Sequence, residues 1–119
     1  MNYEKYLIKK DKLDLLSSLK ALDKKIINKM MKEYDSKNIE ELKEQIIDNF
    51  ELCLSMSKDD MFTKMYFQKL INNENSMFMS AYKDDIEELW VFVYENNGYY
   101  SYYIPSEIKR IIKKELNLE

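Results

Sequence analysis

The stretch from Trp90 to Leu116 constrains the fold most, because here the helical spacing of apolar residues gives way to alternation. It reads WVFVYENNGYYSYYIPSEIKRIIKKEL. Two aromatic-rich runs flank Asn97-Gly98, and both of these residue types tolerate the positive backbone φ angles of a two-residue hairpin turn. The sequence therefore predicts a β-hairpin that Pro105 ends and that a helix follows.

Alternation assigns the hairpin side chains to two faces. The first strand is expected to separate its larger aromatic residues from its valines: Trp90, Phe92 and Tyr94 against Val91 and Val93. The second strand divides in the same way: Tyr100, Tyr102 and Ile104 against Tyr99, Ser101 and Tyr103. Two strands cannot bury both faces against one layer of helices. Either an exposed aromatic face binds something, or further chain covers it.

Upstream of the hairpin, polar residues that can cap a first helical turn precede each apolar-periodic segment. We expect a helix over 12–22 capped by Asp11, a second one from Asp23 to Tyr34, and a third one from Asn38 to Phe50. Residues 3–10 are expected to form a short helix or a frayed arm. Residues 77–82 are ambiguous between a helical turn and an extended segment, and a short helix is expected to begin at 84–85.

A fourth helix is expected after Ser57, which with Asp60 forms a capping-box-like pattern. The helix is apolar over more than half of its circumference: Met61, Phe62, Met65, Tyr66, Phe67, Leu70 and Ile71. Such a helix is either central to a core or part of a partner surface. For the methionines of this region we favour core filling over a binding surface: Met56, Met61, Met65, Met77 and Met79.

The final helix is expected to be capped by Ser106 and to bury Ile108, Ile111, Ile112 and Leu116. These elements predict a mainly α fold with one C-terminal β-hairpin, a helical bundle plus wing. The chain is expected to be one domain over residues 1–119, with a helical part at 1–89 and the hairpin and terminal helix at 90–119.

The segment Ile86–Ile112 resembles winged-helix-type segments in uncharacterised proteins of low-GC Gram-positive bacteria and their mobile elements. The resemblance lies in its apolar strand, Asn/Gly turn, Tyr-rich strand and Ile104-Pro105-Ser106-Glu107-Ile108. More distantly, Lys12–Phe50 is similar to the short helical SAP or Rho N-terminal domains, although it lacks the glycine of their turn. The resemblance implies a winged-helix-like fold and carries over no catalytic residues.

Composition argues against an enzyme. The chain has no histidine, one cysteine and one glycine, so the commonest general base, the usual zinc ligand sets and a phosphate-cradling glycine loop are all missing. Cys53 is interpreted as a small core residue. A divalent ion at the acidic residues of 84–88 is a weaker interpretation than a solvated helix start. We expect no cofactor and no metal.

Sequence features also bear on location. The chain contains no apolar run of about 18 residues, which a membrane-spanning helix would need. Its start, MNYEKYLIKK, is charged and lacks the apolar core of a signal peptide. We therefore expect a cytoplasmic protein without a membrane partner.

Two surfaces are candidates for binding. The final helix carries two basic columns one turn apart that could contact phosphates: Lys109, Arg110, Lys113 and Lys114. We favour the alternative that these residues are its solvated face. The hairpin tyrosines are candidates for a protein interface: Tyr94, Tyr99, Tyr100, Tyr102 and Tyr103. Packing of one hairpin face on the helices is an equally weighted alternative.

Two functional hypotheses follow. The first, which the net charge of −3 and the single arginine favour, is a small protein that binds another protein. It would act as a mobile-element or phage inhibitor of the anti-CRISPR kind, or as a regulatory adaptor. The second hypothesis is a winged-helix-like transcriptional regulator that binds DNA. Homodimerisation through the hairpin is compatible with either hypothesis.

Overall fold

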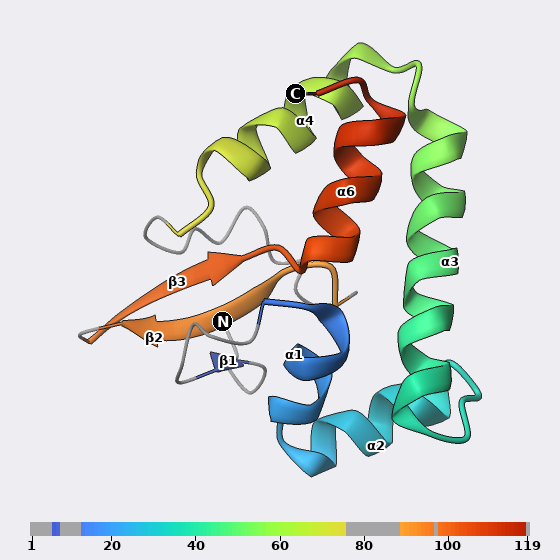
Figure 1. Cartoon of the computed structure of the whole chain (residues 1–119), viewed down its shortest axis with the longest axis vertical. Coiled ribbons are helices and arrows are strands. Elements are labelled where there is room, and N and C mark those ends of the chain that lie inside the picture. Colours follow the sequence, from blue (N-terminus) through green and yellow to red (C-terminus); the bar gives the residue numbers. More distant parts are fainter. Residues whose placement is uncertain (1–5, 8–12, 76–88, 97, 119) are drawn as a thin grey trace.

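The structure, a computed structural model, describes residues 6–7, 13–75, 89–96 and 98–118. The elements follow in this order (Figure 1): β1 (Tyr6–Leu7), α1 (Leu15–Ala21), α2 (Lys24–Glu33), α3 (Ile39–Ser57), α4 (Met61–Asn72), β2 (Phe92–Asn96), β3 (Tyr99–Tyr103) and α6 (Ser106–Glu115). The predicted class, mainly helical with a C-terminal hairpin, is confirmed. The expectations for 77–82 and 84–88 lie outside the described residues.

The predicted hairpin is present. Strands β2 and β3 are antiparallel, and Phe92 pairs with Tyr103 at one end and Asn96 with Tyr99 at the other, which leaves two residues for the turn. Gly98 has a φ of +83°, the conformation for which a glycine was expected. The other turn residue, Asn97, lies outside the described residues.

The hairpin belongs to a larger sheet. Strand β1 pairs with β2 in parallel, so the strand order is β1-β2-β3. Residues 3–10 were expected to form a short helix or a frayed arm. Of these, Tyr6 and Leu7 are described, and they lie in the sheet opposite Val93 and Tyr94, so the expectation is wrong for them. A pairing between the two ends of the chain leaves no local sequence signal.

Helices cover both faces of the sheet. One face, with Phe92, Tyr94 and Tyr103, packs with apolar residues of α1, α2 and the first half of α3. The other face packs with the second half of α3, α4 and α6, and it carries Val91, Val93, Tyr102 and Ile104. The predicted alternation is therefore confirmed. Of the two alternatives for the hairpin faces, cover by further chain is the one found.

Helix α3 extends beyond its predicted end. It runs to Ser57 rather than Phe50, and its length lets it contribute Leu42 and Ile46 to one core and Phe50 and Leu54 to the other. Figure 1 shows it flanking the helices on both sides of the sheet. Trp90, just before β2, packs against both cores.

Buried tyrosine hydroxyls attach the sheet to the helices. The Tyr102 hydroxyl donates to the Leu70 carbonyl of α4 at 2.6 Å. On the opposite face, the Tyr103 hydroxyl lies 2.5 Å from the Ser18 hydroxyl of α1. Because the Ser18 hydroxyl donates its single hydrogen to the Asp14 carbonyl, the Tyr103 hydroxyl is the donor of this pair.

Two of the predicted helix caps are confirmed and three are corrected. Asp23 and Asn38 cap α2 and α3, each accepting a backbone N–H of the first turn. Helix α1 is capped by Asp14 instead of Asp11, because it begins only at Leu15.

Helix α4 is capped by Asp60, because Ser57 still belongs to α3 and its hydroxyl donates to the Cys53 carbonyl. Pro105, not Ser106, occupies the cap position of α6, and no side chain caps this helix. Ser106 is the first residue of the helix, and its backbone N–H donates to the Leu13 carbonyl.

Asp and Asn take the positions after helices that glycine usually occupies. Asp35 follows α2 with a φ of +55°, and Asn117 follows α6 with the same φ. In both cases the next backbone N–H reaches back five residues, from Ser36 to Met31 and from Leu118 to Lys113. These two residue types tolerate the left-handed conformation better than most others, so a chain with one glycine can still end its helices sharply.

No helix among the described residues is both long and apolar enough to cross a membrane.

Candidate functional site

The structure corrects the predicted tyrosine interface. Tyr94, Tyr102 and Tyr103 are at most 3% exposed, because helices cover the sheet on both sides. Tyr100 is half-buried, and Tyr99, next to the turn, is 63% exposed. A partner could reach only Tyr99 and part of Tyr100 without opening the fold.

The four basic residues of α6 do not share one environment. The Lys109 ammonium forms an ion pair with Glu74 at 2.5 Å, and the other Glu74 oxygen accepts the Ile104 backbone N–H at 2.7 Å. Lys109 thus helps to attach the end of α4 to the sheet and α6. The remaining three are exposed: Arg110, Lys113 and Lys114.

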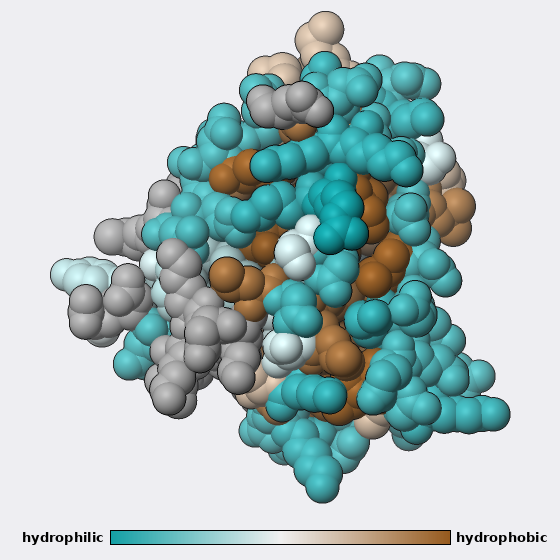
Figure 2. All heavy atoms as spheres, viewed as in Figure 1, coloured by the Kyte–Doolittle hydropathy of each residue, from teal (hydrophilic) through white to brown (hydrophobic). Residues whose placement is uncertain are grey.

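An exposed apolar surface lies where α3 leads into α4. We call it the elbow surface and define it by five large side chains that are between 58% and 80% exposed: Leu52, Met56, Met61, Phe62 and Met65. This finding corrects the expectation that the methionines of this region fill the core, and Met77 and Met79 lie outside the described residues. Figure 2 shows hydrophobic atoms on the upper part of α3, near the end that leads to α4.

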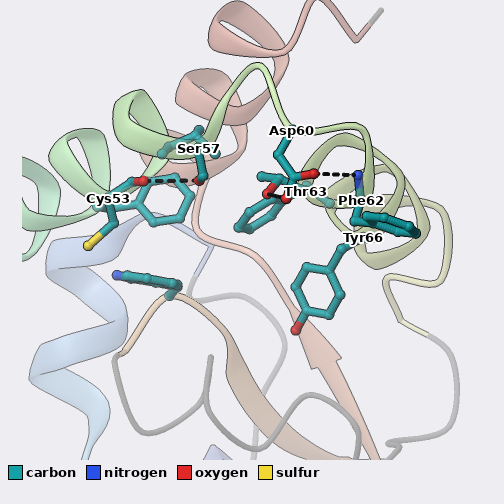
Figure 3. A pocket seen from close by; sticks show the side chains of 10 residues that line it. Cys53, Ser57, Asp60, Phe62, Thr63 and Tyr66 are labelled. Carbon is teal, nitrogen blue, oxygen red and sulfur yellow. Dashed lines mark hydrogen bonds between the residues drawn. The ribbon is translucent and has the colours of Figure 1, made fainter.

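Beside this surface is a pocket of about 320 Å³, which we call the elbow pocket (Figure 3). Half of its lining residues are aromatic: Phe50, Phe62, Tyr66, Phe67 and Trp90. The others are Cys53, Leu54, Ser57, Asp60 and Thr63. The exposed Phe62 belongs to both the pocket and the elbow surface, so one ligand could contact both.

Edge-to-face aromatic contacts join four of the lining residues of the pocket. The ring of Phe50 lies 4.6 Å from that of Trp90 and 5.8 Å from that of Phe67, measured between centroids. Tyr66 contacts Phe67 in the same way at 5.3 Å. Such pairs favour fixed ring orientations, so the pocket is preformed in its aromatic part.

The polar groups of the pocket serve the ends of the two helices. Asp60 accepts the Phe62 backbone N–H at 3.2 Å and the Thr63 hydroxyl at 3.1 Å, and the Ser57 hydroxyl donates to the Cys53 carbonyl at 3.1 Å (Figure 3). Cys53 is exposed, which corrects its interpretation as a core residue. The chain has no histidine that could act as a base beside Cys53.

One polar atom at the pocket has no partner among the described residues. The indole Nε1 of Trp90 is buried and makes no hydrogen bond with them. A buried donor without an acceptor costs about 1–3 kcal/mol. Because Trp90 also lines the pocket, its environment is expected to change when a ligand enters.

A metal centre finds no support within the part of the chain that is described. There, no three Cys, Asp or Glu side chains come close enough together to hold an ion. The acidic residues at 84–88, for which the sequence left a divalent ion as the weaker interpretation, are not among the described ones.

Comparisons with protein families, with curated proteins and with solved structures found no match. The winged-helix resemblance of the C-terminal segment therefore stays a prediction, as does the similarity of the N-terminal helices to SAP and Rho N-terminal domains.

The sequence predicted a partner surface as one of two alternatives for α4, although its methionines were assigned to the core. Helix α4 is apolar over more than half of its circumference, and a helix packed on one side buries only one stripe. Phe67 and Leu70 form that stripe, while Met61, Phe62 and Met65 remain outside. The excess of apolar residues beyond one stripe marked this helix as a candidate for binding.

Proposed function

We propose that this chain is a small non-enzymatic binding protein that acts through protein–protein contacts and uses the elbow surface to make them. The exposure of Phe62, at 78%, together with its exposed apolar neighbours on α3 and α4, carries the proposal. Exposed large apolar side chains next to an aromatic pocket are typical of protein-binding sites.

Burial energetics supports a protein partner. Covering apolar surface contributes roughly 25 cal/mol per Å², and complete burial of one large side chain contributes about 1.5–3 kcal/mol. The five side chains of the elbow surface gain only a minor part of this stabilisation in the isolated chain, because each is more than half exposed. A partner that covers most of them would recover it as binding free energy, less the cost of association.

Such a protein would act by occupying a surface of its partner. Within this proposal the chain is an inhibitor, such as a mobile-element or phage protein directed at a host nucleic-acid enzyme, or a regulatory adaptor. Both roles need a compact binding surface, and the elbow surface offers one.

The second candidate function is DNA binding through α6, and the exposure of Arg110, Lys113 and Lys114 favours it. Three exposed cations can contact phosphates, and the binding would weaken steeply with salt. The net charge of −3 opposes the approach of a polyanion, so this function ranks second.

Affinity capture with matched variants tests the proposal. One variant replaces three exposed apolar residues of α4, Met61→Ser, Phe62→Ser and Met65→Ser. The control replaces three exposed polar residues of the same helix, Lys64→Ser, Gln68→Ser and Lys69→Ser. Both should fold, because exposed substitutions usually change stability by no more than about 0.5 kcal/mol each.

We expect the parent and the control to capture the same protein from cells that produce the chain, and the apolar variant to lose it. Nuclease treatment should leave the capture unchanged. Equal capture by the folded apolar variant would refute the role of the elbow surface. Loss of the partner on nuclease treatment, together with its loss from an Arg110→Gln, Lys113→Gln, Lys114→Gln variant, would favour the second candidate.

A further inference from the structure

Resting on the proposed function, we propose that the elbow pocket receives an apolar side chain from a basic amphipathic helix of the partner. Three observations carry this inference: the size and lining of the pocket, the spacing of the apolar residues beside it, and the charge around both.

The pocket suits a side chain better than a cofactor. Its volume of about 320 Å³ lies at the lower end of the range for ligand sites, roughly 300–1,000 Å³. Its polar groups Asp60, Ser57 and Thr63 are engaged in hydrogen bonds at the helix ends. An occupant would therefore meet mainly aromatic rings, which favours one large apolar side chain.

The spacing of the elbow surface suits a helical partner. Leu52 and Met56 are four residues apart on α3, and Met61 and Met65 are four residues apart on α4. Residues at this spacing form a ridge along a helix, and a second helix can pack its own apolar ridge beside it. Methionine side chains adapt to varied apolar partners, as in other surfaces that bind amphipathic helices.

Charge selects a basic partner. Residues 48–65 contain four acidic residues and two basic ones, a net charge of −2, and all six are exposed: Asp48, Glu51, Asp59, Asp60, Lys58 and Lys64. We call these six residues the rim of the elbow surface. Cations flanking the apolar face of a partner helix would be attracted to its net negative charge.

The same charge argues against a second copy of this chain as the occupant. A symmetric dimer through the elbow surface would place two rims of net charge −2 against each other, and like charges across an interface are unfavourable. A helix with apolar residues on one side and lysines beside them meets no such repulsion.

The chain carries its own reporters for the test. Trp90 is its only tryptophan and lines the pocket, so its fluorescence reports on occupancy. Cys53 is its only cysteine, is exposed and lines the same pocket, so a bulky thiol reagent attached there should obstruct it.

The experiment titrates the full chain with two synthetic amphipathic helices that lack tryptophan. Both have the same leucine and phenylalanine face, and the polar positions are lysine in one peptide and glutamate in the other. We expect the lysine peptide to change the Trp90 emission. At low salt it should bind at least about tenfold more tightly than the glutamate peptide, and this difference in affinity should shrink as the salt concentration rises. Labelling of Cys53 should abolish binding.

A charge variant and its matched control sharpen the test. Asp48→Asn with Glu51→Gln removes two of the four acidic residues beside the elbow surface. It should reduce the ratio of the affinities for the lysine peptide and the glutamate peptide. Glu33→Gln with Asp35→Asn removes two exposed acids at the end of α2, on the far side of the molecule in Figure 1, and should leave the preference unchanged.

Equal affinity for both peptides would overturn the inference, as would binding of the lysine peptide that labelling of Cys53 does not affect. A concentration-dependent dimer that the Phe62→Ser variant abolishes would identify a second copy as the occupant and would also overturn it. Binding of neither peptide would overturn this inference alone. The proposed function would still hold if the variant with Met61→Ser, Phe62→Ser and Met65→Ser loses the captured protein.

Discussion

Glu107 joins two helices that are far apart in the sequence. Its carboxylate accepts the Leu15 backbone N–H at 2.9 Å and the Ser106 hydroxyl at 3.2 Å. The first amides of a helix have no acceptor within it, and Leu15 is completely buried. A side chain at the start of α6 thus satisfies a donor at the start of α1.

Removal of this carboxylate should destabilise the fold. Glu107→Ala leaves the Leu15 N–H without its acceptor, so we expect the free energy of unfolding to fall by about 1–3 kcal/mol. Urea denaturation measures the change. The control Glu51→Ala removes an exposed carboxylate in the middle of α3 and should change stability by less than about 0.5 kcal/mol. Equal effects of the two substitutions would contradict the role of Glu107.

For the hairpin tyrosines, the sequence predicted the face of the hairpin but not the burial. Alternation placed Tyr102 and Tyr103 on opposite faces of the hairpin, and the structure agrees. Alternation does not tell which faces are covered, because that depends on helices distant in the sequence. The acceptor of Tyr102, the Leu70 carbonyl, is 32 residues away, and no local pattern indicates it.

At the scale of elements, Glu74 attaches α4 to the rest of the fold. One of its oxygens accepts the Ile104 backbone N–H, and the other binds the Lys109 ammonium. The following residue, Asn75, donates its backbone N–H to the Tyr102 carbonyl and accepts the Tyr94 hydroxyl through its side chain. This loop is polar in sequence, yet its hydrogen bonds fix the end of α4 against the sheet.

Two substitutions separate the hydrogen bond of Glu74 from its ion pair. Glu74→Ala removes both and should lower the free energy of unfolding by about 1–3 kcal/mol, since a backbone donor loses its acceptor. Lys109→Ala removes only a partly exposed ion pair and should cost about 1 kcal/mol or less. Thermal and urea unfolding measure both. A larger loss from Lys109→Ala than from Glu74→Ala would show that the ion pair dominates.

Local caps made two helix starts predictable, whereas Asp60 was missed as the cap of α4 because α3 runs on through Ser57, the predicted cap. Asp23 and Asn38 each accept an N–H within three residues, and both caps were predicted. The start of α1 was misplaced because its cap depends on Glu107 as well as Asp14. The parallel strand β1 was missed for a related reason: its partner β2 lies more than 80 residues further along the chain.

At the scale of the whole molecule, the arrangement of the helices decides which surface is free to bind. Because helices cover both sheet faces, the aromatic hairpin is mostly core, and the largest exposed apolar side chains lie on α3 and α4. The sequence contained the apolar excess of α4. It did not reveal that α4 buries only the stripe with Phe67 and Leu70.

Photo-crosslinking from a single cysteine placed beside the pocket tests whether the partner binds at the elbow surface. A photoreactive group on Ser55→Cys in the Cys53→Ser background, an exposed position one residue before Met56 that does not line the pocket, should crosslink a specific protein in extracts of cells that produce the chain. The adduct should be absent from the Cys53→Ser protein. The control carries the group on Asn28→Cys in the Cys53→Ser background, an exposed position on α2 at the other end of the molecule in Figure 1.

We expect an adduct from Ser55→Cys that the Met61→Ser, Phe62→Ser, Met65→Ser substitutions abolish, and none from Asn28→Cys. A partner that is captured normally but crosslinks only from Asn28→Cys, or equally from both positions, would contradict binding at the elbow surface.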